Sequence, residues 1–147
     1  MLHGVNPSFH LTQGGWQEHK QSLTAVRCQV FVVKQQVPVV LKLDEHDPHC
    51  HHVLATDAQG RPVGAGRIKA DGYIGRMAVL KDCRRQGVAA AMLAALLEYA
   101  VLQGHTRVFL HVQISAVPFY VRFGFVESGG LFIDAGVLHR YMVKSLY

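Results

Sequence analysis

The apolar segment at residues 88–103 constrains this chain more than any other part of its sequence. Its only charged residue is Glu98, and Gly104 follows it where a glycine typically ends a helix. A helix that is apolar on nearly every side must be covered by other elements, so we expect it to pack against a sheet. The run is shorter than the roughly 20 residues that cross a bilayer, which predicts a buried helix and no membrane span.

The residues before this helix predict a series of antiparallel strands. Three β-rich segments follow one another, at residues 51–56, 62–69 and 73–80. Turn residues separate them at 57–60 and 70–72, which is the pattern of successive hairpins. Upstream, the sequence predicts a short strand at residues 9–12 and an amphipathic helix at residues 17–35, with Pro38 closing that region.

The residues after the helix predict one parallel strand pair. Residues 108–112 form the next strand, which lies parallel to residues 73–80 if the helix crosses over between them. The remaining segments predict a short helix at 116–123 and strands at 125–127 and 138–144. The expected fold class is therefore mixed α/β (α+β): a mostly antiparallel sheet of about six to seven strands with one parallel βαβ pair, flanked by helices.

Composition narrows the class of protein. At 147 residues, half of them apolar and only 17% charged, the chain is expected to be one globular domain spanning residues 1–147. Three cysteines, Cys28, Cys50 and Cys83, match neither a disulfide framework nor a paired metal knuckle, which favours a reducing, cytoplasmic setting. The first seven residues lack the plan of a signal peptide.

The net charge of +5 raises the question of nucleic-acid binding. Basic residues are spread from Lys20 to Lys144, and we interpret them mainly as a solvated surface. A small nucleic-acid-binding domain is the least favoured class. Part of the charge is suited to attracting a phosphorylated ligand.

The loop before the long helix carries the strongest functional signal. It reads Arg84-Arg85-Gln86-Gly87-Val88-Ala89 and places free backbone N–H groups at a helix start, where the helix dipole also favours negative charge. Gly87 is suited to a backbone conformation closed to other residues, and Ala89 is small enough for close approach. The expected ligand is an anion, most simply a phosphate, although neither common nucleotide motif is present.

Three consecutive motifs resemble the GNAT N-acetyltransferase superfamily. They read Gly75-Arg76-Met77-Ala78-Val79, then the Arg84-to-Ala89 loop, then Pro118-Phe119-Tyr120-Val121-Arg122-Phe123-Gly124-Phe125. Further segments, including Val26-Arg27, Asp44-Glu45-His46-Asp47 and His52-Val53-Leu54-Ala55, resemble the ElaA-like subgroup. Lys34 and Lys42 depart from that pattern, because they stand where glutamates are expected.

The resemblance implies transfer of acetyl from acetyl-CoA to a primary amine of a small molecule or peptide. It implies that Met77 and Val79 pair with the pantetheine arm and that the N–H of Val79 polarises the acetyl oxygen. The full cofactor set implied is Met77, Ala78, Val79, Arg84, Arg85, Gln86, Gly87, Val88, Ala89 and Ala90. The resemblance also leaves open whether the chain forms a homodimer.

Tyr120 falls at the family position of the general acid that protonates the coenzyme A thiolate. In many relatives, a glutamate on the strand that residues 73–79 occupy here acts as the general base. This strand has no glutamate. His111 is the first candidate for the base. The other candidates are Glu45, His52, His139 and an ordered water chain. Gln113, Glu45 and His52 are the candidate acceptor contacts.

Two alternatives stay open from the sequence. The chain is a metal protein only if residues 46–52, which include four histidines and a cysteine, gather ligands, but their spacing matches no known metal motif. It is a non-catalytic acyl-CoA-binding module if the missing strand glutamate is decisive. The presence of Tyr120 favours an enzyme instead.

Overall fold

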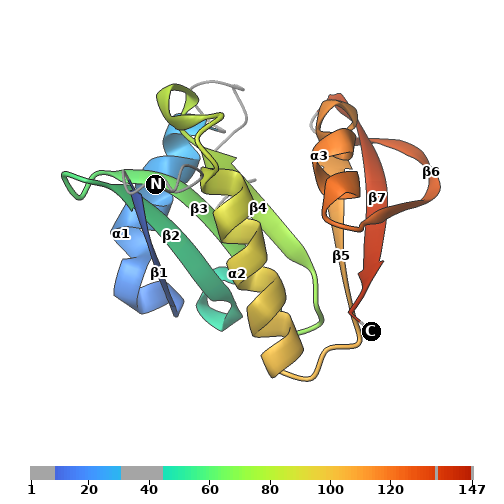
Figure 1. Cartoon of the computed structure of the whole chain (residues 1–147), viewed down its shortest axis with the longest axis horizontal. Helices are drawn as coiled ribbons and strands as arrows, with labels where there is room; N and C mark the ends of the chain where they lie inside the picture. The colour runs from blue at the N-terminus through green and yellow to red at the C-terminus, as the bar shows by residue number, and fades with distance from the viewer. Residues whose placement is uncertain (1–8, 31–44, 135, 147) are drawn as a thin grey trace, which may run out of the picture.

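A computed structural model of the chain describes residues 9–30, 45–134 and 136–146. Two sheets and three α-helices make up this part of the molecule (Figure 1). The mixed α/β architecture with mainly antiparallel strands is the predicted fold class. The expected single sheet is refined, however, because the strands separate into a four-stranded and a three-stranded sheet.

The first sheet is an antiparallel series in the order β1-β2-β3-β4. Its strands are β1 Phe9–Gly14, β2 His51–Asp57, β3 Pro62–Ile68 and β4 Ile74–Val79. All four were predicted, because each alternates or concentrates β-forming residues between turn residues. The turn between β2 and β3 is closed by Asp57, whose Oδ1 accepts hydrogen bonds from the backbone N–H groups of Gln59 and Arg61.

The second sheet has the order β5-β7-β6, also antiparallel. Its strands are β5 Arg107–Gln113, β6 Val126–Asp134 and β7 Val137–Ser145. The two sheets meet at one parallel bridge between Tyr73 and Phe109, where the Phe109 N–H donates to the carbonyl of Gly72 at 3.1 Å. Beyond this bridge β4 and β5 diverge, as Figure 1 shows. The predicted parallel pair therefore exists only at its first residues.

Helix α2, Val88–Leu102, covers one face of the first sheet. Gly64 of β3 allows close approach, because a Cβ there would lie 3.0 Å from Val88 and 3.1 Å from Met92. The helix ends as predicted. Gly104 has φ +85°, its N–H donates to the carbonyl of Val101, and the next N–H donates to that of Ala100.

Helix α1, Trp16–Arg27, lies on the opposite face of the first sheet. The predicted apolar positions Leu23, Val26 and Val30 are buried. The predicted continuation to residue 35, Val33 and Pro38 lie outside the described residues. Helix α3, Val117–Arg122, is short and packs against the second sheet. No helix among the described residues is long and apolar enough to span a bilayer.

A buried ionic cluster joins α1 to the first sheet. The guanidinium of Arg27 donates to both carboxylate oxygens of Asp47 at 2.9 Å, and that of Arg67 donates to one of them at 2.7 Å. All three side chains are at most 2% exposed. Burial lowers the pKa of Arg27, and the neighbouring Asp47 carboxylate opposes that shift. The cluster therefore ties α1 to β3 through charged side chains, in a buried region where apolar residues are more usual.

Candidate functional site

A cavity of about 750 Å³ lies where β4 and β5 diverge. It is lined by all of residues 73–79, by the loop and first turn of α2, by the end of β5, by α3 and by two residues of the β6-β7 hairpin. Its lining includes Tyr73, Arg76, Met77, Val79, Arg84, Arg85, Gly87, Val88, Ala89, Ala90, His111, Gln113, Tyr120, Asp134 and His139. The cavity thus joins the predicted loop, the edge of β4 and Tyr120.

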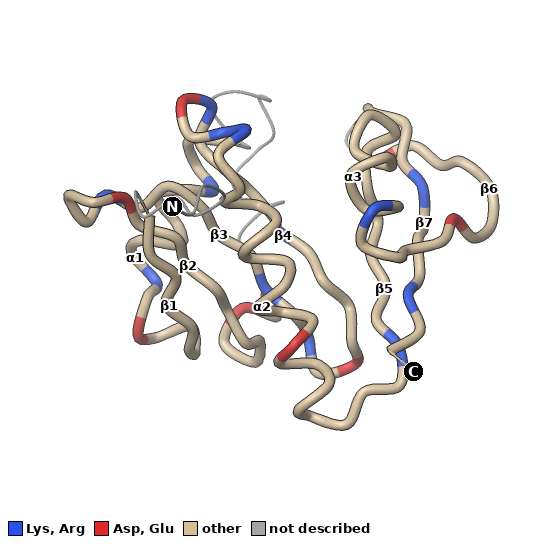
Figure 2. Tube along the Cα trace, viewed as in Figure 1, with Lys and Arg blue, Asp and Glu red and all other residues tan. Residues whose placement is uncertain are grey.

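The start of α2 lines one end of the cavity and has the features that favour an anion. Gly87 caps the helix with φ +84° and ψ +6°, and the first turn contains no acidic residue and no side-chain cap. The N–H groups of the first turn have no partner within the helix, so they are available to a ligand. Arg84 and Arg85 line the cavity beside them, and the loop before α2 carries basic segments in Figure 2. This geometry suits a diphosphate.

Backbone conformation is unusual at this end. Among the described residues, the non-glycine residues with positive φ are Arg76 at +52° and Arg85 at +64°, and both line the cavity. Strained backbone conformations gather at functional sites, where the surrounding structure holds them in place. At Arg76 the strain coincides with an irregularity in the pairing of β3 with β4.

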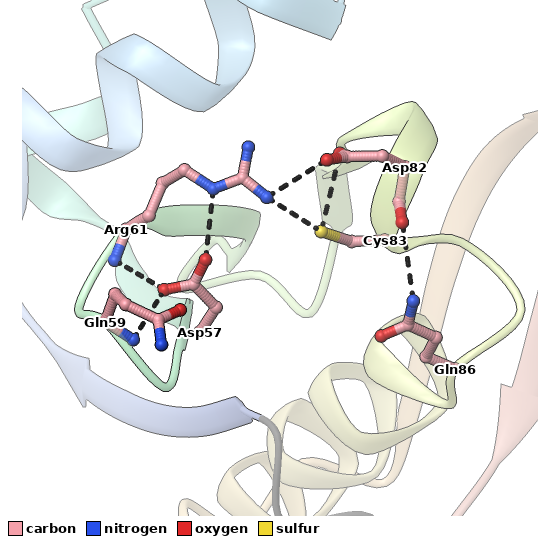
Figure 3. A network of polar contacts seen from close by, with 6 residues as sticks. All are labelled: Asp57, Gln59, Arg61, Asp82, Cys83 and Gln86. Atoms are coloured by element: carbon pink, nitrogen blue, oxygen red, sulfur yellow. Dashed lines mark hydrogen bonds and ion pairs between the residues drawn. The ribbon is translucent and has the colours of Figure 1, made fainter.

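Hydrogen bonds from the β2-β3 turn hold the loop in place (Figure 3). Arg61 bridges the two segments: its Nε donates to Asp57 at 3.0 Å and its terminal nitrogen donates to Asp82 at 3.1 Å. Gln86 Nε2 donates to the backbone carbonyl of Asp82 at 3.3 Å. Hydrogen bonding from Arg61 lowers the pKa of both aspartates, so they stay ionised. Gln86 is part of this hydrogen-bonded network and does not line the cavity.

The free edge of β4 faces the cavity. The N–H of Leu80 donates to Val63 of β3, and Ala78 pairs with Ala65 in the same ladder. Because hydrogen-bonding groups alternate between the two edges of a strand, the backbone groups of Met77 and Val79 point away from β3. The carbonyl of Val79 accepts a hydrogen bond from Arg84 Nε at 3.1 Å. An extended ligand can therefore pair with this edge as an additional strand.

Tyr120 lies on α3 with its side chain 8% exposed. The rings of Phe119 and Phe125 pack edge-to-face against it, at centroid distances of 5.0 Å and 5.8 Å. Burial raises the pKa of Tyr120 to about 12. The phenol is therefore protonated at any working pH and faces the cavity as a hydrogen-bond donor.

His111 lies on β5 on the other side of the cavity. Its Nδ1 is 3.3 Å from the hydroxyl of Tyr73, and the rings of Phe132 and Tyr141 pack around it at 5.1 Å and 5.6 Å. The imidazole is accessible from the cavity, yet partial desolvation lowers its pKa below the ordinary value near 6.5. His111 is therefore neutral at pH 7.

Two predicted acceptor contacts lie away from the cavity. Glu45 is exposed on the surface and does not line it. His52 is fully buried, packs 5.2 Å from the Trp16 ring and donates from Nε2 to the carbonyl of Asp47 at 2.9 Å. The expectation that His52 contacts an acceptor is therefore corrected, because this side chain belongs to the core beneath α1. Gln113 and His139 do line the cavity.

The cavity also contains residues that sequence reasoning missed: Tyr73, Arg76 and Asp134. Tyr73 stands at the start of a predicted strand, Arg76 stands inside the Gly75-to-Val79 motif and Asp134 lies between two predicted strands, and no pattern of their own singled them out. Lys34 and Lys42 lie outside the described residues. Within the described ranges, no group of three or more His, Cys, Asp or Glu side chains is arranged to hold a metal ion.

Comparison with known proteins gives consistent matches. The family described as acetyltransferase (GNAT) domain matches residues 19–146. The uncharacterized N-acetyltransferase YjcF of Bacillus subtilis is 38% identical over 132 residues, which cover 87% of this chain and 94% of that protein.

Solved structures agree. Escherichia coli ElaA superposes with a TM-score of 0.83 at 25% identity, covering 93% of this chain and 99% of the other. An acyl-CoA N-acyltransferase from Pseudomonas aeruginosa gives 0.84 at 24% identity, covering 94% and 100%.

Proposed function

This chain belongs to the GNAT acetyltransferase family and is ElaA-like, and from that premise we propose that it transfers acetyl from acetyl-CoA directly to a primary amine, with Tyr120 as the general acid. Family membership makes it an acyltransferase with an acyl-CoA co-substrate and an amine-bearing acceptor. The finer assignment rests on one observation. A single cavity joins an open helix start, the free edge of β4 and a buried phenol.

The residues at the start of α2 fit the diphosphate of coenzyme A. An acidic side chain or a capping hydroxyl would compete for the free N–H groups, and neither is present. Gly87 leaves open space where a side chain would stand, because no heavy atom lies within 4 Å of a built Cβ. Arg84 and Arg85 add charge-assisted donors beside the same N–H groups.

The β4 edge orients the reacting carbonyl. Acetyl-CoA supplies the acyl group as an activated thioester when it is bound. Backbone groups of Met77 and Val79 pair with the arm of the ligand, and the N–H of Val79 donates to the acyl oxygen where negative charge develops. The Val79 carbonyl accepts a hydrogen bond from Arg84 Nε, so a ligand that pairs with this carbonyl would take the place of Arg84 there.

Tyr120 protonates the departing sulfur. A phenol with a pKa of about 12 is a weak acid, and a thiol in water has a pKa of about 8.5. The same burial that raises the pKa of the phenol also raises the pKa of a thiol beside it, since the phenolate and the thiolate both lose hydration. Proton donation within this buried site is therefore less unfavourable than the solution values indicate.

His111 removes the proton from the amine. For Nε2 to accept that proton, Nδ1 must carry the hydrogen and donate it to the Tyr73 oxygen, which is one of the two tautomers that this 3.3 Å contact allows. Tyr73 stays a phenol, because burial raises its pKa. His139 is the second candidate, since its Nδ1–H donates to the Val137 carbonyl at 2.7 Å and leaves Nε2 as an acceptor.

The proton balance follows from these positions. The amine nitrogen bonds to the acetyl carbon as the carbon–sulfur bond breaks. The ammonium loses two protons: one is matched by the proton that Tyr120 delivers to sulfur, and the other leaves through His111 to solvent. Tyr120 regains its proton from the nitrogen side of the reaction, so no residue stays altered and no covalent enzyme intermediate is needed.

Two measurements on the full chain test this proposal. Acetyl-CoA should raise the melting temperature, because a ligand that binds only the folded state stabilises it. Free thiol should then be released when a primary amine is added. The absence of a thermal shift at saturating acetyl-CoA would refute the proposal. Binding without thiol release from any amine would favour the non-catalytic acyl-CoA-binding module.

A further inference from the structure

We call the part of the cavity lined by Tyr73, His111, His139 and Asp134 its acceptor end. Among the described residues, this end has one negative charge. In the part of the chain that the structure describes, Asp134 is the only acidic side chain that lines the cavity, whereas Arg76 and Arg122 line it with positive charge that is not assigned to the diphosphate. A primary amine approaches as an ammonium ion, since its pKa is about 10.4 in water. It therefore needs a counter-charge to enter a basic cavity, and Asp134 supplies it.

Asp134 lies next to the catalytic candidates in space. It ends β6 opposite Val137, and two residues further along β7 stands His139, which pairs with Gln113 of β5. Side chains alternate along each strand, so Asp134, Val137 and His139 share one face with His111. The charge of Asp134 is close enough to oppose the lowering of the His111 pKa and to add to the raising of the Tyr73 pKa.

Aromatic rings cover that same face. Tyr73, His111 and His139 line the cavity. Phe132 packs against two of them, 5.1 Å from the His111 ring and 5.7 Å from the His139 ring, the latter stacked at 29°. Tyr73 meets His111 edge-on at 5.2 Å. Rings held by other rings keep their orientation, so the wall is suited to a flat apolar group.

This combination disfavours polycationic acceptors. A polyamine or an aminoglycoside brings several ammonium groups, and beyond Asp134 the described cavity lining offers Arg76 and Arg122 in place of further carboxylates. Like charges brought together in a partly enclosed cavity repel each other. A monoamine pairs its single charge with Asp134 and leaves an apolar body for the rings.

Resting on the transfer function proposed above, we propose that the acceptor is a primary monoamine joined through a short chain to a flat apolar group, with its ammonium held by the Asp134 carboxylate and its flat group packed on Tyr73, His111 and His139. Held there, the ammonium lies beside the neutral imidazole of His111. Asp134 is then a binding residue that sets specificity, and it takes no part in proton transfer.

Thiol release with acetyl-CoA and three amines tests the class. The amines are 2-phenylethylamine, 2-cyclohexylethylamine and spermidine. The first should have a kcat/KM about threefold or more above the second, which has the same chain length but a saturated, puckered ring, and about tenfold or more above spermidine. Equal or better use of spermidine would overturn the inference while leaving the transferase proposal in place.

Asp134→Asn tests the residue. It keeps the shape of the side chain at an exposed hairpin end and removes the charge. The KM for 2-phenylethylamine should rise about tenfold, equivalent to about 1.4 kcal/mol, with the KM for acetyl-CoA unchanged. Glu98→Gln is the matched control, because Glu98 is exposed on α2 outside the cavity lining and the charge change is the same. Equal amine KM values for the two variants would overturn the role of Asp134.

Ligand-observed NMR separates a failure of this inference from a failure of the transferase proposal. The chain loaded with coenzyme A should bind 2-phenylethylamine, and Asp134→Asn should weaken that binding. If binding is found without turnover by any amine, the acceptor site stands and the transferase proposal fails. If the loaded chain does not bind the amine, the acceptor inference fails.

Discussion

Replacing Gly87 with alanine separates the role of this residue in folding from its role in ligand binding. Gly87 has φ +84° at the start of α2 and lines the cavity. A Cβ there meets no protein atom within 4 Å, so the substitution causes no clash in the free protein. Its only direct cost to folding is the left-handed backbone conformation.

The magnitude follows from that conformation. An alanine in the left-handed region costs roughly 1–2 kcal/mol. Reduced freedom of the unfolded chain offsets about 0.4–1 kcal/mol of this. The free energy of unfolding should therefore fall by about 1 kcal/mol, which lowers the melting temperature by about 2–4 °C for a chain of this size.

Ligand affinity should fall by more than stability does. The new methyl group stands where the diphosphate approaches the backbone, and a misplaced N–H-to-phosphate hydrogen bond costs about 1.5–3 kcal/mol. The dissociation constant for coenzyme A should rise by about 10- to 150-fold, measured by isothermal titration calorimetry.

Gly60→Ala is the matched control for this experiment. Gly60 has φ +83°, has no heavy atom within 4 Å of a built Cβ, and lies in the β2-β3 turn outside the cavity lining. Both variants should lose the same stability, and only Gly87→Ala should lose affinity. An unchanged dissociation constant for Gly87→Ala would refute the assignment of this loop to the diphosphate.

The remaining predictions concern the acid, the base and the buried cluster. Tyr120→Phe should lower kcat about 100-fold or more while the coenzyme A dissociation constant stays within about twofold, and equal thiol-release rates would remove Tyr120 as the acid. Because burial lowers the pKa of His111, kcat/KM should stay constant down to a pH below 6.5 and then fall as His111 gains a proton. His111→Gln should abolish this acidic limb of the pH profile. An identical limb in the variant would exclude His111 as the base. Asp47→Ala should reduce the free energy of unfolding by about 3–5 kcal/mol in urea titrations, since Arg27 and Arg67 lose a buried carboxylate, and a loss under 1 kcal/mol would contradict the buried ion pairs.

Local patterns predicted most of the elements that the structure describes. The strands of the first sheet and helix α2 depend on residues close together in the chain, through alternation, turn residues and the glycine that ends the helix. Gly87 and Gly104 were predicted to sit where only a glycine is comfortable, and both have positive φ. These features are readable because their physical causes act over a few residues.

A cofactor end of the candidate site could be predicted from the sequence, whereas the arrangement of the acceptor end could not. The loop before α2 is one continuous segment, so its chemistry is visible in a single stretch of sequence. His52 shows the opposite case: its strand was predicted, but the face that it occupies depends on the packing of α1 against the sheet, which buries it.

The Arg84-to-Ala89 loop, the helix that follows it and the family resemblance were thus determined by the sequence itself. Tertiary structure decided that β4 and β5 diverge after one bridge, and that the hairpin carrying Asp134 brings its carboxylate beside Tyr73 and His111. The reason is physical. A helix start acquires its affinity for anions from its own backbone, but an acceptor pocket exists only where strands distant in sequence come together, and long-range packing alone sets that.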